Sequence, residues 1–427
     1  MTVYVQNIDG QPLMPTERCG FVRRLLKNKK ATVVKRCPFV VRLLYETTDV
    51  VQPVTLGVDA GSKMVGLSAT TESKELYAAE IALRTDITSN LSSRREFRAS
   101  RRNRKTRYRK PRFNNRVKSK HKGWLAPSVE AKINAHIQAV KSVRKILPVS
   151  HINIEVASFD TQLIQALNEG RSAPEGTNYQ HGEQLGFWNV REYVLCRDGH
   201  KCACCHGKSK DAILNVHHIE SRKTGGNAPN NLITLCETCH QGYHNGAVKL
   251  PASIKRGANL RDAAFMNIMR WTFYDRLKNM YPCEISMTYG YITKNIRIAC
   301  GLPKTHCIDA RCISGNPYAE PLGYYFNQRR VRSRNRQLHR ATFSRGGIRK
   351  ANQAAKEVFG FRLFDKVKYS GQECFVFARR TQGTFGVRLL DGTRINDGVS
   401  WKRLNFLEHS GTILTECKLN SKNCVFY

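Results

Sequence analysis

One short stretch, residues 202–244, constrains the fold of this chain more than any other. It carries two Cys-x-x-Cys pairs, Cys202/Cys205 and Cys236/Cys239. Four thiolates at this spacing suit a tetrahedral zinc site. The gap between the pairs is longer than in a simple zinc ribbon, and it holds histidines and an asparagine that zinc does not need. The sequence therefore predicts a zinc-stabilised module that carries a second group of polar side chains.

The polar side chains of this second group are His217, His218, Asn231, His240 and His244. His240 and His244 are four residues apart and therefore share one face of a helix. The pattern resembles the HNH endonucleases (ββα-metal nucleases), in which a strand carries the His-His pair and a helix carries the final His-x-x-x-His. The alternative is a purely structural zinc finger with incidental histidines. Four cysteines already complete a zinc shell, however, so the histidines need another role.

The resemblance to HNH endonucleases implies a division of labour among these residues. His218 would deprotonate a water that attacks a scissile phosphate, because a neutral imidazole acts as a base at physiological pH. His217 would bind a divalent cation together with His244 and His240. Asn231 would orient the loop that holds the base. The cation would offset negative charge on the transition state.

The composition indicates the partner. Lys and Arg number 71 against 33 Asp and Glu, which gives a formal net charge of +38. Such a charge attracts polyanions through counterion release. With 41% hydrophobic residues the chain has ample material for several cores. It shows no apolar run near the ~18 residues of a membrane span and no signal peptide, so we expect a soluble cytoplasmic protein without a membrane partner.

The positive charge is concentrated in two places. Between Arg94 and Arg112, 11 of 19 residues are basic. A disordered tail is one interpretation of such a run, but Phe97 and Tyr108 are interleaved and no Gly or Pro intervenes before Pro111, which favours an Arg-rich helix. Its candidate nucleic-acid contacts are Arg94, Arg95, Arg98, Arg101, Arg102, Arg104 and Arg107. A second basic stretch covers residues 329–350 and includes Arg330, Arg332, Arg334, Arg336, Arg340 and Arg345.

Three further segments place acidic or histidine side chains at the ends of predicted elements. The first is an apolar strand within 54–62 that ends in Asp59 and precedes a strand over 64–70. The second is a strand over 151–156 that holds Glu155 and follows a helix over 128–147. The third is a helix start within 302–310 that places His306 and Asp309 one turn apart. Each is weak alone, because a strand Asp before Gly is usually a turn residue and a lone strand Glu is usually solvated.

Together and in this order, the three segments resemble a RuvC-type nuclease of the RNase H fold that is split into three parts. An Arg-rich helix follows the first part, and an HNH domain is inserted between the second and the third. This arrangement is similar to IscB proteins and to the type II CRISPR effectors. Residues 11–15, the Arg18-Cys19-Gly20 motif and a basic helix over 21–30 resemble the PLMP domain at the start of IscB proteins.

The resemblance implies an α/β multidomain fold, with an RNase H-like (RuvC) core split in three segments, an inserted ββα-metal HNH domain and a small C-terminal β domain. The expected parts are a PLMP domain at 1–53, RuvC-I at 54–90, a bridge helix at 91–120, RuvC-II at 121–180, an HNH domain with its zinc site at 181–255, RuvC-III at 256–345 and a C-terminal domain that contacts a target-adjacent motif at 346–427.

The resemblance also implies an activity. Asp59, Glu155 and Asp309, with His306, would hold two Mg²⁺ ions for phosphodiester hydrolysis. The Arg94–Arg112 run would contact the guide segment of a structured RNA, called ωRNA in this family, and base pairing would select double-stranded DNA. The HNH site would cut the guide-paired strand and the RuvC site the displaced strand. We expect a monomeric ribonucleoprotein in the bacterial cytoplasm, associated with the nucleoid when it binds DNA.

The C-terminal segment predicts a small β-barrel or half-barrel. Strands over 373–379 and 385–390 are followed by an Asp391-Gly392 turn, which is a hairpin signal. The candidate DNA contacts are Tyr369, Arg379, Arg380, Arg388 and Lys402. A purely structural cap is the alternative role for this segment.

Two rival functions stay open. One is a protein-guided homing or junction-resolving nuclease, although a homing enzyme usually repeats one kind of site. The other is a catalytically silent RNA-binding regulator, although loss of activity would normally show first at Asp59, Glu155 or His218.

Overall fold

The computed structural model describes residues 2–102, 124–156, 190–220, 229–250, 261–282, 284–332 and 355–420. The chain divides into two compact units. The larger unit consists of residues 1–159 and 266–427, and the inserted unit consists of residues 160–265. None of the helices in the described ranges is long and apolar enough to cross a membrane.

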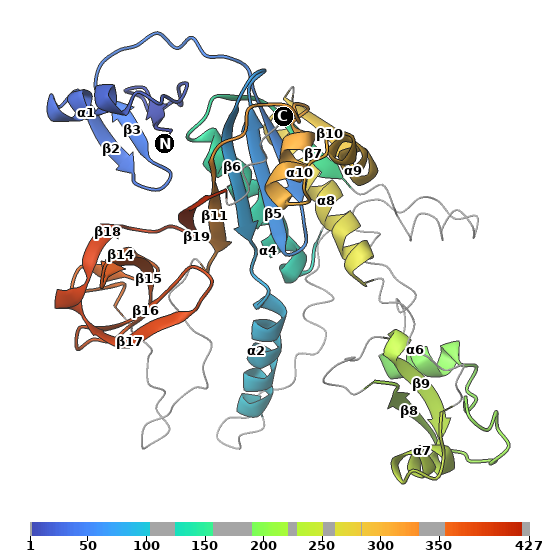
Figure 1. Cartoon of the computed structure of the whole chain (residues 1–427). Helices are drawn as coiled ribbons and strands as arrows, with labels where there is room; N and C mark the ends of the chain where they lie inside the picture. Colours follow the sequence, from blue (N-terminus) through green and yellow to red (C-terminus); the bar gives the residue numbers. More distant parts are fainter. Residues whose placement is uncertain are drawn as a thin grey trace. The chain divides into compact units, whose positions relative to one another are not determined.

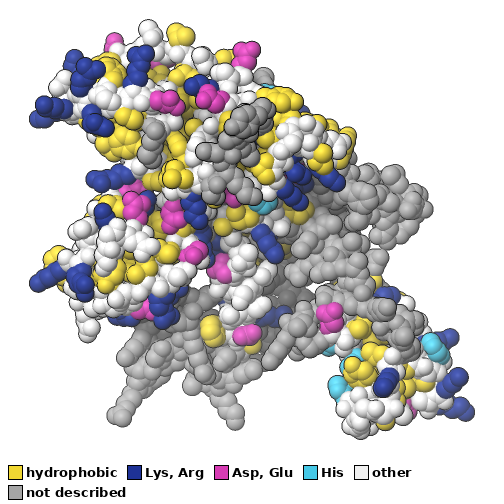
Figure 2. Space-filling model, viewed as in Figure 1, with side chains coloured by type: hydrophobic (Ala, Val, Ile, Leu, Met, Phe, Trp, Pro, Cys, Tyr) yellow, Lys and Arg dark blue, Asp and Glu magenta, His cyan; other side chains and the backbone are white. Residues whose placement is uncertain are grey.

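The N-terminal part of the larger unit is a small sheet with one helix. Its elements are β1 (Tyr4–Gln6), α1 (Cys19–Lys27), β2 (Ala31–Lys35) and β3 (Val40–Leu43), with strand order β1-β3-β2. The helix begins earlier than the predicted range of 21–30 and ends at Lys27, because Lys29 adopts a left-handed φ of 54° that turns the chain into β2. Figure 2 shows Lys and Arg side chains gathered over the α1 and β2 region.

A seven-stranded sheet forms the centre of the larger unit (Figure 1), in the order β10-β7-β4-β5-β6-β11-β19. The strands are β4 (Val54–Ala60), β5 (Met64–Thr70), β6 (Glu75–Ala82), β7 (Val149–Val156), β10 (Ile285–Tyr289), β11 (Tyr324–Arg330) and β19 (Ile413–Leu419). Strands β4, β5 and β6 are an antiparallel meander, whereas β7 and β10 run parallel to β4. Distant segments of the sequence therefore share one sheet.

The helix α10 (His306–Ile313) lies across β4 and β5, and two glycines make this contact possible. A Cβ at Gly57 would be 1.9 Å from the Ala310 carbonyl oxygen, and a Cβ at Gly66 would be 1.9 Å from the His306 carbonyl oxygen. The helix begins where the Thr305 hydroxyl accepts a hydrogen bond from the Ile308 amide. A helix start at this position was predicted, but the role of the two glycines was not.

Four more helices accompany the sheet. They are α2 (Ile87–Arg102), α4 (Pro127–Arg144), α8 (Arg261–Met280) and α9 (Gly290–Ala299). Helix α4 begins with Pro127 in its first turn, a favourable position for proline. It ends at Arg144, three residues before the expected end at Leu147, and its apolar positions at helical spacing are buried.

Helix α2 contains the first part of the predicted Arg-rich helix and starts at Ile87, well before Arg94. None of the side chains that the structure describes on α2 is buried, and Arg94, Arg95 and Arg98 are exposed. The side chains of Arg101 and Arg102, and the whole of Arg104 and Arg107, lie outside the described residues. A helix without a buried face gains little from packing among the residues described.

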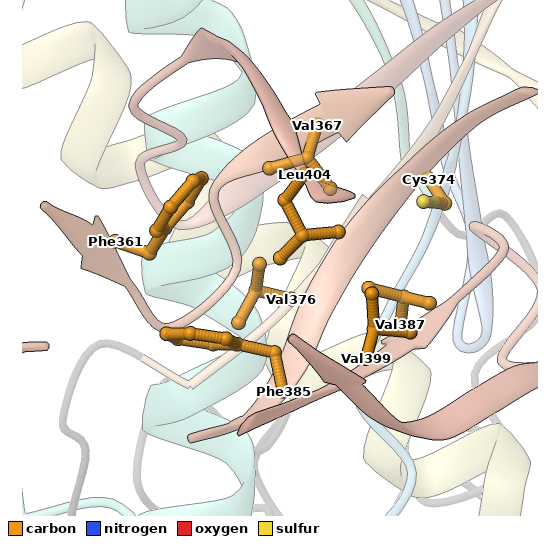
Figure 3. Packing of buried hydrophobic residues seen from close by; sticks show 8 residues of the cluster. All are labelled: Phe361, Val367, Cys374, Val376, Phe385, Val387, Val399 and Leu404. Carbon is orange, nitrogen blue, oxygen red and sulfur yellow. The ribbon is translucent and has the colours of Figure 1, made fainter. Parts of the chain in front are cut away.

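The C-terminal part is a five-stranded antiparallel sheet in the order β17-β16-β15-β14-β18. Its elements are β14 (Lys366–Tyr369), β15 (Gln372–Arg379), β16 (Thr384–Arg388), β17 (Arg394–Ser400), η3 (Trp401–Arg403) and β18 (Asn405–Glu408), and a separate hairpin joins β12 (Glu357–Val358) to β13 (Phe361–Arg362). Aromatic and branched side chains pack between them (Figure 3). Gly392 has the positive φ of 96° that the predicted turn requires.

The described strands of the C-terminal part form an open sheet, because β17 and β18 lie at opposite ends. This order agrees with the predicted half-barrel and not with a closed barrel. The last strand, β19, pairs with β11 of the central sheet, so the chain returns to the core after 346–412. A short segment carries no local signal of which sheet edge it will complete.

The inserted unit contains a ββα module, as the sequence predicts. Helix α6 (Val190–Arg197) precedes β8 (Leu214–His218), the short η2 (Pro229–Asn231), β9 (Leu232–Cys236) and α7 (Glu237–His244). Strands β8 and β9 are antiparallel, with His218 opposite Leu232. Tyr193 and Val194 of α6 pack against Leu232.

Candidate active site

Four cysteine thiols converge in the inserted unit. Cys202 and Cys205 lie before β8, while Cys236 and Cys239 lie at the end of β9 and in α7. The four sulfur atoms are all within 4.8 Å of one another. Cys205 Sγ and Cys236 Sγ are 3.7 Å apart. This separation is the edge of a tetrahedron whose centre is about 2.3 Å from each sulfur, the usual zinc–thiolate bond length. The cluster therefore fits zinc.

The surroundings of the thiols agree with a cation among them. Hydrogen bonds from Ser209 lower the pKa of the Cys205 thiol, and the Ser209 hydroxyl is also 3.0 Å from Cys236 Sγ. Burial and the adjacent sulfur atoms raise the pKa of Cys239, because a second thiolate is unfavourable beside the first without a metal. The role of Ser209 was not predicted, since a serine four residues after a Cys-x-x-Cys pair has no distinctive spacing.

Three histidines form a second cluster in the same unit, and their ring nitrogens lie within 4.8 Å of one another. His217 comes from β8, while His240 and His244 come from one face of α7. The Nε2 atoms of His240 and His244 are 3.3 Å apart, and the His217 ring centroid is 5.3 Å from that of His240. Figure 2 shows histidine side chains at the surface of this unit.

The electrostatics of His217 suit a metal ligand. The residue is buried, and its Nε2 atom has no hydrogen-bond partner. Burial, together with the neighbouring His240 and His244, lowers the pKa of His217 to about 4. The ring is therefore neutral at physiological pH and keeps a lone pair for a cation. An orphaned buried nitrogen that faces two more imidazoles fits a divalent metal bound through nitrogen.

His218 follows His217 on β8 and is not part of the three-histidine cluster. Successive side chains of a strand point to opposite faces, which separates the two residues. Asn231 is fully buried and holds the loop that follows His218. Its side-chain oxygen accepts a hydrogen bond from the Glu220 amide at 2.8 Å, and its side-chain nitrogen donates to the Glu220 carbonyl at 3.0 Å. Asn231 is thus placed to fix the backbone beyond His218.

A carboxylate cluster lies in the larger unit, on the central sheet. Asp59 at the end of β4 is buried, and its Oδ2 is 2.6 Å from His306 Nδ1. Glu155 of β7 is also buried. Asp309 lies one turn after His306 on α10. The hydrogen bond to Asp59 raises the pKa of His306, and the charge of Asp309 adds a smaller increase. The fold brings together all four residues that the sequence singled out.

Two arginines contact these carboxylates, and neither was predicted. Arg270 of α8 donates from Nε to the Ala60 carbonyl at 2.8 Å and contacts Glu155 Oε1 from Nη2 at 2.9 Å. Arg297 of α9 has its Nε 2.8 Å from Asp309 Oδ1. Their helices have no motif that marks an arginine as a partner of a distant carboxylate, so only the folded structure reveals them.

The carboxylates of this cluster disfavour one another's charge. Burial raises the pKa of Glu155, and the charge of Asp59 adds to this effect despite Arg270. Burial and Asp59 also raise the pKa of Asp309. In the described part of the chain only the cysteine and histidine clusters have three or more ligand atoms within 4.8 Å of one another. The carboxylate oxygens are farther apart than this. Such spacing is compatible with ligands that are shared between two cations about 3.5–4 Å apart. Their donor set fits Mg²⁺.

Two protein-family models match parts of this chain. Residues 202–246 match the model of the HNH endonuclease family, and residues 3–182 match the model described as RRXRR protein. No curated protein matches the chain. Streptococcus thermophilus Cas9 in complex with AGGA PAM is 14% identical with a TM-score of 0.30, over 45% of this chain and 26% of that one. The Type II-C Cas9 enzyme from Actinomyces naeslundii is 11% identical, with a TM-score of 0.24. The match covers 62% of this chain and 59% of that enzyme.

The chain therefore spans 26% of one of these Cas9 chains and 59% of the other. The HNH match covers the β8–β9–α7 module, with the two cysteine pairs and the three clustered histidines inside it. Sequence, local fold and ligand geometry converge on one conclusion for the inserted unit. The inserted unit contains an HNH endonuclease module.

Proposed function

We propose that this chain is an RNA-guided, metal-dependent endonuclease of the IscB type that cuts double-stranded DNA with two separate sites. The observation that carries the proposal is the presence of two chemically different ligand clusters in two different units. The inserted unit offers thiolates and imidazoles, whereas the larger unit offers carboxylates. A single-site nuclease has no use for both.

The HNH module would cut the strand that pairs with the guide. His218 would take a proton from the attacking water, and Asn231 would keep His218 in place through its two hydrogen bonds to Glu220. His217, with His240 and His244, would hold a divalent cation, which supplies charge stabilisation at the phosphate when it is bound. The four cysteines would hold zinc and stabilise the fold around these residues.

The carboxylate cluster would cut the displaced strand. Asp59, Glu155 and Asp309 would hold Mg²⁺, and His306 would orient Asp59 through their hydrogen bond. Support for a split RNase H-like core comes from the central sheet. All of its strands except β19 derive from residues 54–82, 149–156 and 285–330, with the inserted unit between the second and third groups.

Guide RNA would bind along α2 and the basic surface. The formal charge of +38 and the absence of buried side chains in the described part of α2 support this assignment. In the C-terminal sheet, Arg379 and Arg380 donate hydrogen bonds to the carbonyls of Lys356 and Asp397, and Lys402 is exposed. Contact of these residues and of Tyr369 with target DNA stays a prediction, as does the monomeric ribonucleoprotein.

The test is to purify the protein from bacteria, to sequence the RNA that copurifies, and to reprogramme its guide segment. One abundant structured RNA whose altered guide redirects cleavage to a matching duplex is the expected result. Robust cleavage at one fixed sequence by RNA-free protein would favour the rival homing or junction-resolving nuclease. Tight RNA binding without cleavage of a matched duplex would favour the silent regulator.

A further inference from the structure

An arginine-rich cavity lies in the larger unit, and no residue of the carboxylate cluster lines it. Its volume is about 290 Å³. Three segments line it: the connection from β6 to α2, the end of β11, and the C-terminal sheet. The charged lining residues are Arg84, Asp86, Arg329, Arg330, Arg332 and Arg388. Asp86, the one acidic residue among them, already accepts two hydrogen bonds from Arg84 at 2.9 and 3.0 Å. The lining therefore has a large excess of positive charge.

Two of these arginines have a guanidinium nitrogen that no described residue satisfies. Arg332 and Arg388 have buried Nε atoms without a hydrogen-bond partner. Among the described residues, neither makes an ion pair with a carboxylate. Burial lowers the pKa of Arg332, the charge of Arg84 lowers it further, and the charge of Asp86 opposes this only in part. Guanidinium groups that repel one another at the wall of a cavity are favourable only if an anion enters.

Aromatic rings complete the cavity. The Arg332 guanidinium lies over the Phe364 ring at 5.8 Å, and the Arg388 guanidinium lies over the Phe377 ring at 5.6 Å. The two rings meet edge to face at 5.3 Å. Cationic groups that alternate with aromatic rings are the chemistry with which proteins bind single-stranded nucleic acid, through phosphate contacts and base stacking. The volume is of the order of one nucleotide.

We propose that this cavity binds one nucleotide of single-stranded guide RNA, with its phosphate on Arg332 and Arg388 and its base against Phe377. The Phe377 ring is partly exposed, whereas Phe364 is buried in the core beneath it. The inference rests on the proposed RNA-guided function. RNA is favoured over DNA because residues 83–86 of the cavity continue directly into α2, the helix proposed to bind the guide (Figure 1). An RNA strand that is bound along α2 and continues past the first turn of this helix would enter the cavity.

The first test measures binding of a fluorescent 12-nucleotide oligouridine RNA to the full chain at several salt concentrations. Arg332→Gln and Arg388→Gln should each weaken binding about tenfold, because each removes one charge-assisted hydrogen bond to a phosphate. The slope of log affinity against log salt should fall by about 0.7 for each phosphate that the protein no longer neutralises. Phe377→Leu should weaken binding with an unchanged slope, because it removes no charge.

The matched controls are Arg362→Gln and Arg394→Gln. Both arginines belong to the C-terminal part but lie outside the cavity, paired with Glu357 at 2.9 Å and Asp397 at 3.0 Å. Their affinity for the RNA should stay within twofold of the parent chain. If the cavity variants behave like these controls, while the parent chain still cleaves under RNA guidance, the cavity assignment is wrong and the proposed function stands. Thermal unfolding of every variant separates weaker binding from a failure to fold.

A second measurement locates the bound RNA directly. RNA that contains 4-thiouridine should crosslink, in the assembled complex, to the peptide that contains Phe377. Crosslinks on α2 but not on this peptide would overturn the assignment. Single-stranded DNA of the same length is the competing probe. If DNA binds more tightly than RNA and depends on Arg332 and Arg388, the cavity holds the displaced DNA strand and the RNA assignment fails.

Discussion

The two ligand clusters are assembled in opposite ways. In the inserted unit, every cysteine and histidine ligand comes from one stretch of chain between Cys202 and His244. In the larger unit, Asp59, Glu155 and Asp309 come from three distant elements that meet only in the folded sheet. We expect a bound metal to hold the small module together, whereas the carboxylates are brought together by a large hydrophobic core.

This difference has energetic consequences. The ββα module has a small core, in which its cysteines pack with Ile233 and Leu235. Small domains of this kind usually need a metal or disulfides to fold. The central sheet buries most residues of β4 and β5 and does not need a metal for its shape. Removal of bound metal should therefore unfold the ββα module. The carboxylate site should keep its fold and lose only its activity.

The largest expected effect is the loss of zinc. Cys236→Ser should unfold the inserted unit, since structural zinc contributes about 10 kcal/mol or more to small metal modules. Zinc content by atomic spectroscopy should fall to zero, while the larger unit keeps its unfolding transition. Cys204→Ser is the matched control, because Cys204 lies between the ligands but outside the four-thiol cluster. Equal zinc in both variants would contradict the four-cysteine assignment.

The corresponding test of the carboxylate cluster uses the two glycines under α10. Gly57→Ala or Gly66→Ala should destabilise the larger unit by about 3 kcal/mol or more, because the new Cβ overlaps a backbone carbonyl that cannot move alone. The shift of α10 should displace His306 and Asp309 and abolish cleavage of the displaced strand. Gly323→Ala, where a Cβ meets nothing within 4 Å, should change neither property. Denaturant unfolding and a strand-labelled cleavage assay measure the two effects.

A buried histidine should give the larger unit a dependence on pH. Burial lowers the pKa of His136 on α4 to about 4. The unfolded chain takes up this proton below its ordinary pKa of about 6.5, so the free energy of unfolding should fall as the pH drops from about 6.5 to about 4. The decrease amounts to about 3 kcal/mol over this window. His136→Leu should reduce this dependence in urea unfolding at pH 7 and pH 5. An unchanged dependence would mean that His136 is protonated in the fold.

The smallest effect concerns the loop beyond His218. Asn231→Ala should cost about 1–3 kcal/mol, since it leaves the Glu220 amide and carbonyl without their partner. Cleavage of the guide-paired strand should slow, while cleavage of the displaced strand continues at its normal rate. Asn245→Ala, at an exposed position in the same unit, is the control. Equal slowing of both strands would mean that Asn231 does not act within one site.

The contrast between the clusters also explains what the sequence could predict. The cysteine and histidine ligands occur at characteristic spacings within one short stretch of sequence. The candidate ligands between Cys202 and His244 could therefore be identified without a structure. Strand β5 has the predicted bounds of Met64–Thr70, because its apolar run ends at turn residues on both sides. Local patterns encode such elements well.

Long-range packing was not accessible in the same way. Arg270 and Arg297 look like ordinary helix-surface residues until α8 and α9 bring them to Glu155 and Asp309. Gly57 and Gly66 look like weak points in two strands until α10 covers them. The pairing of β19 with β11 is equally non-local. Each of these features depends on contacts between residues far apart in the sequence.

The central claim is that two independent nuclease sites act on opposite strands. It is tested by a duplex labelled on both strands, incubated with guide RNA and Mg²⁺ and resolved on a denaturing gel. Asp59→Ala should leave only the guide-paired strand cut, and His218→Ala should leave only the displaced strand cut, because the two sites share no ligand. Asp59→Ala/His218→Ala should bind the duplex without cutting it. If either single substitution abolishes both cuts while target binding persists, the sites are not independent and the claim is contradicted.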